Sequence, residues 1–407
     1  MAVLMALTVG LVTAWSASVA LVLLVYRREL TILWREPVFR VPILIVESDD
    51  WGAGPLTQAN ALRQIADVLQ RHRDVTGRSP VMTLALILAV PDGPAIRAHG
   101  CYRAVELDDP RFTSVLDALQ EGKARGLFSL QLHGLEHYWP PALMASGDPA
   151  VQQWLQGKVP AATEQLPSHL QSRWVDARGL PSESLSCEDI EEAVATEVQI
   201  FERVVGESPR VVVPPTFVWT RAVEAAWEAA GLRCIVTPGW RYPCRDAQGR
   251  PGGDEGPIAN GDRVGGLTYL VRTDYFEPSR GRDAEHALTV FEKVVAQGRP
   301  CLLENHRDNF IGGTAACQES LRQLDALVSE GLARFPRTRF LSTQELCEIA
   351  RDANPEWVHL RLRDRLPFVW ERLRHSGRLW RLLKLAGVAG LGRWVFQLIR
   401  PSTPFVT

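Results

Sequence analysis

The feature that most constrains the fold is a short apolar run that ends in two adjacent carboxylates. Residues 43–46 read Ile-Leu-Ile-Val, and Glu47-Ser48-Asp49-Asp50-Trp51-Gly52 follows directly. A continuous aliphatic run of this length is typical of a strand that is buried on both faces, as in a parallel sheet. Burying Asp49 and Asp50 at its end would be costly unless a cation or a substrate meets them there. We therefore expect a functional site at the end of this strand.

Strand and helix patterns alternate along the body of the chain. Further strand candidates lie at 80–90, 127–132, 210–216, 232–240 and 301–306, and helical patterns lie between them, for example at 56–76, 112–123, 187–205, 221–231 and 284–298. This alternation predicts an α/β fold with a parallel sheet or barrel built from βα units. Residues 141–186 have no clear period, so we expect an insertion on the rim of the site.

Two histidines follow the strand candidate at 127–132. His133 and His137 are four residues apart and can converge on one ion, and imidazole is the usual nitrogen ligand of zinc. The same five residues also match the H-x-x-E-H pattern of a class of metalloproteases, which needs both histidines on one helix. Pro140-Pro141 follows directly, and the preceding residues read as a strand. The protease therefore remains a weaker alternative.

Taken in order, these motifs resemble a known family. The sequence Asp49-Asp50, His133-x-x-x-His137, Pro214-Pro215, Trp240 and a late His306 is similar to the NodB-homology polysaccharide deacetylases, carbohydrate esterase family four. The resemblance covers roughly Val41 to Ala350 and implies a distorted (β/α)7 barrel whose site lies at the carboxyl ends of the strands.

The resemblance also implies a role for each matching residue. Asp50, His133 and His137 would bind a divalent cation, usually zinc, with Asp49 as general base and His306 as general acid. Trp51, Pro215, Thr216 and Trp240 would contact the substrate or its oxyanion. The implied reaction removes an N-acyl group, acetyl or formyl, from an amino sugar of a glycan.

Two departures from the family pattern bear on the site. Val213 stands where the family has an arginine that orients the base, so Arg210, Arg241 or Arg307 would have to replace it. The aspartate expected near Trp240 is also missing. The missing arginine favours, as an alternative, a barrel that binds a glycan or a lipid-linked sugar without hydrolysing it.

The N-terminus has the composition of a membrane anchor. No side chain from Met1 to Tyr26 is charged, and this span exceeds the roughly 20 residues that a membrane-spanning helix needs. A cleaved signal peptide is the competing interpretation. Arg27, Arg28, Arg35 and Arg40 follow the span, which by the positive-inside tendency places the body in the cytoplasm.

The expected domain organisation follows from these segments. We expect an anchor at 1–26, a basic juxtamembrane linker at 27–40, the barrel at 41–350 and a tail at 351–407. The tail mixes arginines with Trp, Phe and Leu at helical spacings, which predicts an amphipathic segment on an anionic membrane surface. The alternative is a helix packed on the protein's own core.

Composition excludes some other classes of function. The net charge of -2 gives no reason to expect a nucleic-acid partner, and the seven cysteines are scattered and contain no CxxC pair. Such spacing is typical of reduced thiols in a cytosol. A cytoplasmic site held at the bilayer suggests, as a hypothesis, a lipid-linked N-acetyl or N-formyl sugar rather than finished cell-wall polymer. The expected partners are membrane lipids and an amino-sugar-containing glycan or a polyprenyl-linked saccharide.

Overall fold

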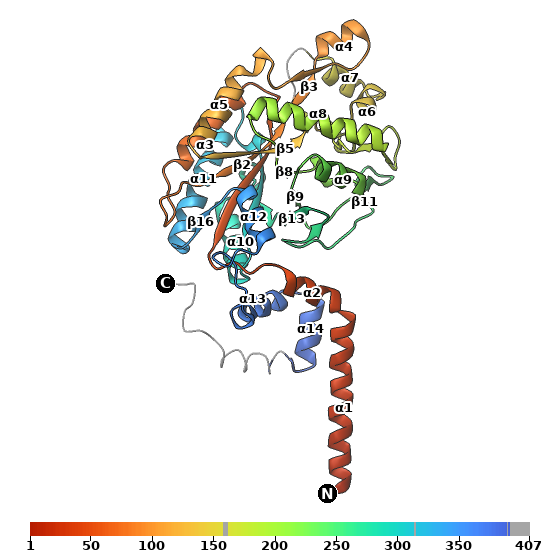
Figure 1. The fold of residues 1–407 in the computed structure, drawn as a ribbon, viewed down its shortest axis with the longest axis vertical. Helices are drawn as coiled ribbons and strands as arrows, with labels where there is room; N and C mark the ends of the chain where they lie inside the picture. The colour runs from red at the N-terminus through yellow and green to blue at the C-terminus, as the bar shows by residue number, and fades with distance from the viewer. Residues whose placement is uncertain (158–161, 313–314, 389, 391–407) are drawn as a thin grey trace.

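The structure is a computed structural model that describes residues 1–157, 162–312, 315–388 and 390. It has an α/β body from which an N-terminal helix projects (Figure 1). The predicted tail beyond residue 390 and residues 158–161 of the predicted insertion lie outside the described residues.

One curled sheet organises the body. Its strand order is β12-β13-β9-β8-β5-β2-β1-β15-β14, and β16 pairs with the start of β1. Every pairing in it is parallel except that of β12 with β13. The predicted α/β class with a parallel sheet is therefore confirmed. The strands are β1 (Ile43–Gly52), β2 (Met82–Ile87), β5 (Phe128–Gly134), β8 (Val211–Val212), β9 (Cys234–Thr237), β12 (Arg263–Val264), β13 (Leu267–Val271), β14 (Asp274–Tyr275), β15 (Cys301–His306) and β16 (Arg339–Phe340).

A single stretch of chain joins the two ends of the curled sheet. β13 pairs with β9, and β14 pairs with β15, although only Arg272 and Thr273 separate the two strands. The backbone N–H of Arg272 donates to Thr237, and that of Thr273 donates to Leu302. Arg272 therefore lies where the sheet curls back on itself, and the sequence reasoning assigned no strand there.

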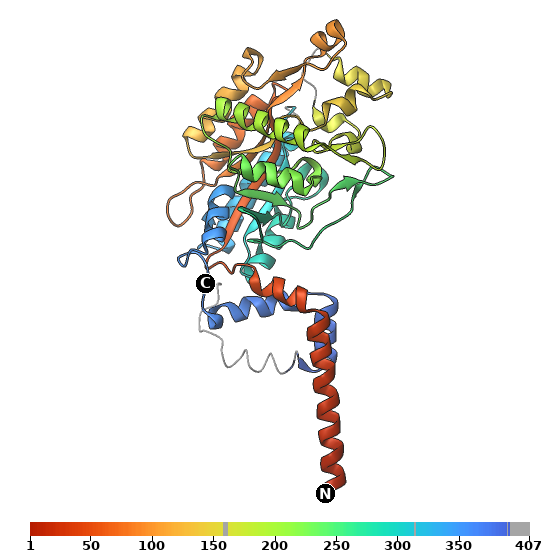
Figure 2. The same cartoon turned by 45° about the vertical axis from the view of Figure 1, so that its right-hand side comes forward.

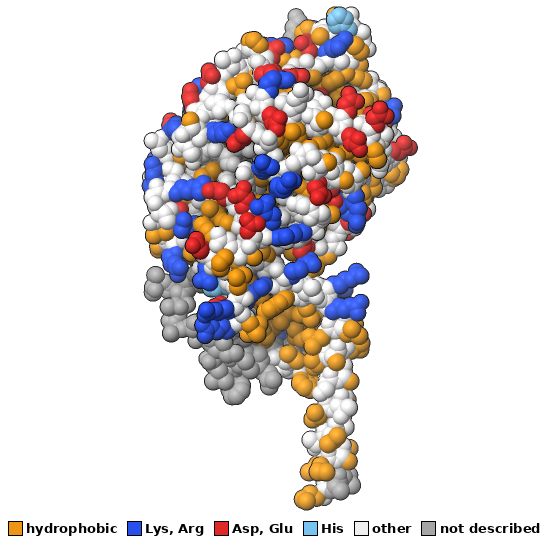
Figure 3. All heavy atoms as spheres, in the orientation of Figure 1, with side chains coloured by type: hydrophobic (Ala, Val, Ile, Leu, Met, Phe, Trp, Pro, Cys, Tyr) orange, Lys and Arg blue, Asp and Glu red, His pale blue; other side chains and the backbone are white. Residues whose placement is uncertain are grey.

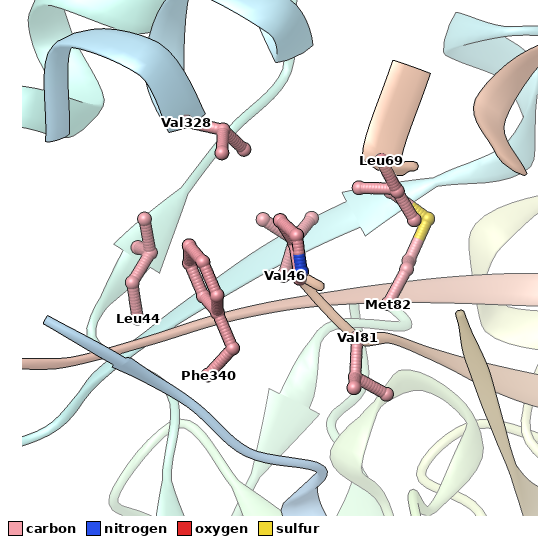
Figure 4. A pocket seen from close by; sticks show the side chains of 8 residues that line it. Leu44, Val46, Leu69, Val81, Met82, Val328 and Phe340 are labelled. Atoms are coloured by element: carbon pink, nitrogen blue, oxygen red, sulfur yellow. The ribbon is translucent and has the colours of Figure 1, made fainter. Parts of the chain in front are cut away.

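The two faces of β1 are buried for different reasons. Leu44 and Val46 pack outward against the helices, whereas Ile43 and Ile45 belong to an inner apolar cluster. Figure 4 shows the outward layer, where Leu44, Val46 and Phe340 lie around a small apolar cavity. The helices that cover the sheet are α3 (Gln58–Leu69), α5 (Thr113–Ala124), α8 (Cys187–Val205), α9 (Arg221–Ala229), α10 (Ala284–Ala296) and α11 (Ala315–Arg334).

The inner apolar cluster fills the amino-terminal end of the sheet. It includes Leu346, Cys347 and Ala350 of α12 (Thr343–Asp352), together with Ile43, Ile45 and Leu302 from the strands. Further along β1 the same inner face carries Glu47 and Asp49, because alternate residues of a strand share a face. The polar groups of the interior therefore lie toward the carboxyl ends of the strands.

Short elements follow the carboxyl ends of β2, β5 and β9 along the chain. They are the hairpins β3 (Ala89–Pro91) with β4 (Ala104–Glu106), β6 (Val175–Asp176) with β7 (Glu183–Ser184) and β10 (Cys244–Arg245) with β11 (Pro251–Gly252), and the helices α4 (Gly93–His99), α6 (Pro140–Met144) and α7 (Pro149–Leu155). Tyr138, Leu143 and Leu155 form part of a separate small core there.

The N-terminal helix is apolar and projects from the body. α1 (Ala2–Val25) contains a candidate span, Leu4–Val25, with a mean hydropathy of 2.1 and no buried residue. By length and composition it can cross a membrane, and a signal sequence would have the same properties. α1 and the curled sheet lie at opposite ends of the long axis (Figures 1 and 2), and Figure 3 shows apolar side chains along α1 with basic ones above it.

Two C-terminal helices pack beside this projection. α13 (Leu362–Arg374) contacts α2 (Arg27–Arg35), and α14 (Arg378–Leu385) contacts α1. The Arg372 guanidinium is buried and donates hydrogen bonds to five backbone carbonyls, those of Leu33, Glu36, Pro37, Gln297 and Gly298. In the described part of the tail, α13 is therefore docked on the body of the protein.

Candidate metal centre

A local irregularity in β1 brings both aspartates to one place. The register with β2 shifts between Ser48 and Trp51, and Asp50 has a φ of 70°. Such left-handed backbone is uncommon for a residue other than glycine, although aspartate tolerates it better than most. The irregularity interrupts the alternation of side chains, so Asp50 lies with Asp49 at the strand end instead of on the opposite face.

The two histidines come from the end of a neighbouring strand and the loop after it. His133 lies on β5, and His137 lies in the irregular segment that precedes α6. The pair is therefore not on a helix, and Glu136 faces Tyr102 and Arg173 instead of an ion. This arrangement excludes the H-x-x-E-H protease geometry.

Asp50, His133 and His137 converge on one point. The Oδ1 atom of Asp50 is 3.5 Å from Nε2 of His133 and 3.4 Å from Nε2 of His137, and all three side chains are buried. Two ligands about 2.1 Å from a tetrahedral zinc ion would be about 3.4 Å apart. The two distances from Asp50 therefore match a tetrahedral ligand set, and all three ligand atoms lie within 4.8 Å of one another.

The protonation of this group also fits a cation. His133 Nδ1 lies 2.7 Å from the carbonyl oxygen of Val213, which can only accept, so Nδ1 carries a proton and Nε2 is the atom that faces Asp50. Burial alone would lower the pKa of His133, but Asp49 and Asp50 raise it, so a cation that binds Nε2 would displace a proton there. Burial lowers the pKa of His137 to about 4, which keeps that ring neutral near pH 7. Oδ1 of Asp50 is buried and has no hydrogen-bond partner among the described residues. A divalent cation would satisfy this carboxylate, so the residues fit the ion that the sequence predicted.

Asp49 is held by an arginine that the sequence reasoning missed. Nη1 and Nη2 of Arg272 each lie 2.7 Å from an oxygen of Asp49, and Nε lies 2.8 Å from Glu47. Burial alone would raise the pKa of Asp49, but the Arg272 guanidinium and the nearby histidines hold it below its usual value. Asp49 is therefore an oriented, ionised carboxylate beside the three-ligand group.

None of the three predicted arginines takes this position. Arg210 donates to the carbonyl of Gly231, Arg241 pairs with Glu224 and Glu255, and Arg307 pairs with Glu164. Arg272 replaces them because it lies at the junction of β13 and β14 and enters the interior from there.

His306 has a carboxylate partner of its own. The end of β15 pairs His306 directly with Asp49 of β1, and Nδ1 of His306 lies 2.5 Å from Glu277. Burial alone would lower the pKa of His306, but the hydrogen bond to Glu277 and the charges of Asp50 and Asp49 raise it to about 10. Glu277 was missed by the sequence reasoning. It follows β14, a strand of two residues that leaves almost no sequence signal.

A second acidic group lies beside His306. Glu304 is two residues earlier on β15, and its Oε1 lies 3.8 Å from Nε2 of His306. Ligand atoms of Asp49, Glu304 and His306 also lie within 4.8 Å of one another. Arg272 binds both oxygens of Asp49 and lies 3.5 Å from Glu304. The guanidinium therefore supplies the positive charge between these carboxylates, where a second cation would otherwise lie.

Of the remaining predicted site residues, Pro215 lies beside β5, Trp51 is buried and Trp240 is partly exposed. Pro215 lies beside Gly134 of β5, and Thr216 follows it with a φ of 54°. The fully buried Trp51 instead belongs to the outer core and donates from Nε1 to Ser48, so it is not exposed to a substrate. Trp240 is 37% exposed, and its ring packs on Gly256.

The predicted insertion reaches the site through Glu164. This carboxylate binds Nε and Nη2 of Arg307, at 3.2 and 3.1 Å. Arg307 directly follows His306, and its guanidinium lies against Gly54, just after β1. Burial and the negative charge of Asp50 raise the pKa of Glu164. Glu164 and Arg307 therefore border the site, next to His306.

Together these features define an α/β protein with one carboxylate and two imidazoles at the carboxyl end of a curled parallel sheet. No family model and no curated protein matches the chain. Solved structures similar to it include a peptidoglycan N-acetylglucosamine deacetylase, at 11% identity over 76% of this chain and 90% of that chain, with a TM-score of 0.37.

Two further solved structures show similarity of the same order. A family 4 acetyl xylan esterase from Clostridium thermocellum, solved with a cobalt ion, shares 10% identity over 75% of this chain and 91% of that chain, with a TM-score of 0.37. A 4-alpha-glucanotransferase from Thermococcus litoralis shares 11% identity, with a TM-score of 0.39, and this chain spans 40% of it. Similarity this low gives no basis for assigning an activity, so any assignment has to rest on the residues of the site.

Proposed function

We propose that this protein is a metal-dependent hydrolase that removes an N-acyl group, acetyl or formyl, from an amino sugar of a glycan. The observation that carries the proposal is the convergence of Asp50, His133 and His137, with the separate Asp49 and His306 beside them. The resemblance of the motifs to the NodB-homology deacetylases supplies the substrate class.

The five side chains divide the work of amide hydrolysis. Asp49, ionised and fixed by Arg272, takes a proton from the attacking water. The new bond joins the water oxygen to the acyl carbon, and the bond from that carbon to the sugar nitrogen breaks. His306, protonated through its pairing with Glu277, gives its proton to the departing nitrogen. The products are a carboxylate and a free amino sugar.

Asp50, His133 and His137 would hold the cation, and zinc is an ion that two imidazoles and one carboxylate favour. When bound, it acts as a Lewis acid that polarises the acyl carbonyl and makes the nearby water more acidic. The chain adds the orientation of His133 through Val213 and a backbone N–H at Thr216 that would face the developing oxyanion.

The direct test of this proposal compares activity in wild type and in two variants. Wild type is expected to release acetate from N-acetylglucosamine oligomers, and a chelator is expected to abolish the release. Asp49→Asn removes the base and should lower kcat by about 10²–10⁴-fold. Arg210→Lys, on the other side of the fold, is the matched control and should keep full activity. Full activity in Asp49→Asn would contradict the assigned role.

The burial of the site favours one second candidate. The side chains of Asp50, His133 and His137 are only 3–7% exposed, and Glu164 with Arg307 borders them. A barrel that binds an amino-sugar glycan without hydrolysing it would also tolerate such a closed site. Calorimetric binding of N-acetylglucosamine oligomers without acetate release would favour this binder over the hydrolase.

We further propose that α1 anchors the protein in a membrane with the body on the cytoplasmic side. The apolar α1 and the four arginines that follow it support this placement. The basic residues of α13 and α14 would meet anionic lipids. Cys101 and Cys187 are exposed, so a membrane-impermeant maleimide should label them only after the cells are permeabilised. Labelling of intact cells would contradict the orientation.

A further inference from the structure

We infer that the site takes amino sugars that extend well away from the membrane surface, such as soluble or long-chain glycans, and excludes a sugar carried directly on a lipid phosphate in the same bilayer. This inference rests on the proposed hydrolase function and on the proposed anchor. The observation behind it is that the anchor and the site lie at opposite ends of the sheet.

The anchor joins the amino-terminal end of the sheet through several tight contacts. The backbone N–H of Phe39 donates to Gly298, which lies just before β15, and that of Arg40 donates to Trp357. Arg299 binds the buried carboxylate of Glu36. These contacts, with the five bonds of Arg372, tie α2 and α13 to the edge where β1 and β15 begin.

The candidate site lies at the other end of the same strands. β1 runs from Ile43, beside the anchor, to Asp50, and β15 runs parallel to it toward His306. Seven residues at the rise of a β-strand span about 23 Å. In both ribbon views α1 and the carboxyl ends of the strands lie at opposite ends of the molecule (Figures 1 and 2).

This separation limits which substrates can reach the site. The polar layer on each side of a bilayer is only about 5–8 Å deep. A sugar attached directly to a lipid phosphate stays in that layer, whereas the site stands about 23 Å beyond the edge of the sheet that faces the bilayer. When the tethers of an enzyme site and a substrate cannot span the distance between them, the effective concentration of the substrate at the site is near zero. A soluble or long glycan has no such limit.

The first test compares two substrates on the full-length protein in vesicles. One is a soluble N-acetylglucosamine disaccharide, and the other is N-acetylglucosamine on a polyprenyl diphosphate in the same vesicles. In vesicles we expect acetate release from the lipid-linked substrate to be at least about tenfold slower than from the disaccharide. Release from the lipid-linked substrate should rise when detergent removes the protein and the substrate from the bilayer. Equal rates in vesicles would overturn the inference. Release from neither substrate, in vesicles or detergent, would contradict the hydrolase function instead.

The second test measures the position of the site without any activity. The variant Cys187→Ser is labelled with a fluorescent dye on Cys101, which follows α4 on the site side of the body. Energy transfer from this dye to acceptors on the lipid surface should be weak. The control carries Cys187→Ser, Cys101→Ser and Glu356→Cys, which places the dye beside Arg40, and it should transfer strongly. Strong transfer from both positions would show that the site lies near the membrane and would overturn the inference.

Discussion

The best-defined single residue in the site is Arg272, because it fixes the geometry of the proposed base. Its guanidinium binds both oxygens of Asp49 and one oxygen of Glu47, and its side chain is buried. Lysine keeps the positive charge but cannot form the bidentate hydrogen bonds to Asp49. We expect Arg272→Lys to lower kcat by about 10–100-fold, with a smaller change in KM, since the base loses its orientation. Steady-state kinetics on N-acetylglucosamine oligomers measures this.

The matched control for this substitution is another buried arginine. Arg241 also pairs with two carboxylates, those of Glu224 and Glu255, but it does not contact Asp49. Arg241→Lys should keep kcat near the wild-type value even if the unfolding midpoint falls. Equal losses of kcat in the two variants would mean that Arg272 acts only through stability.

Glu277 sets the pH range over which His306 can act as an acid. The hydrogen bond that His306 donates to Glu277 helps to raise the pKa of His306 to about 10. A general acid must be protonated, so activity falls as the pH rises through this pKa. Glu277→Gln removes the negative charge and lowers the pKa of His306. We expect the alkaline limb of the kcat/KM profile to move to lower pH, while the acid limb stays in place. An unmoved alkaline limb would contradict the pairing.

At the scale of elements, the strands with long apolar runs were predictable and the short ones were not. β2, β5 and β15 lie within three residues of the predicted strands, because aliphatic runs followed by polar residues identify them. β1 begins at the predicted residue, Ile43, but continues through the acidic residues to Gly52. β13 and β14 follow a Gly- and Pro-rich loop and are only a few residues long. They flank Arg272 and precede Glu277, so the sequence reasoning missed the two partners of the base and the acid together.

The irregularity in β1 could not be predicted from the sequence either. Strict alternation places Asp49 and Asp50 on opposite faces, and only the left-handed backbone of Asp50 removes this conflict. The resemblance supplied the roles of the two aspartates, and the structure supplies the reason why adjacent residues can serve one site.

Helix α13 depends on one buried side chain for its position. Arg372 donates to carbonyls in the α2 segment and in the turn before β15, and it lies 3.6 Å from Glu36. Arg372→Leu leaves these acceptors and Glu36 without that partner, which should cost about 3 kcal/mol. Hydrogen exchange should accelerate in α13 and α2 and stay unchanged in β1. The control is Arg374→Leu on the exposed side of α13. Unchanged exchange in Arg372→Leu would refute this role.

At the scale of the whole molecule, α1 and α2 meet α13 and α14 beside the amino-terminal edge of the sheet. α1 with α14 and α2 with α13 form one projection below the body (Figure 1). The sequence predicted an apolar anchor and a basic amphipathic tail, but it could not show that α13 would dock on α2. That docking holds the site on the side of the protein that faces away from the projection.

The proposed hydrolase activity requires three side chains that are far apart in the sequence to bind one cation. The metal content of the protein tests this requirement most directly. Elemental analysis of purified full-length protein should find about one divalent ion per chain in wild type and in Asp49→Asn, and almost none in His133→Ala. The two variants separate metal binding from base catalysis, because Asp49 pairs with Arg272 whereas His133 converges on Asp50. A metal-free wild type, or His133→Ala that keeps its ion, would contradict the account.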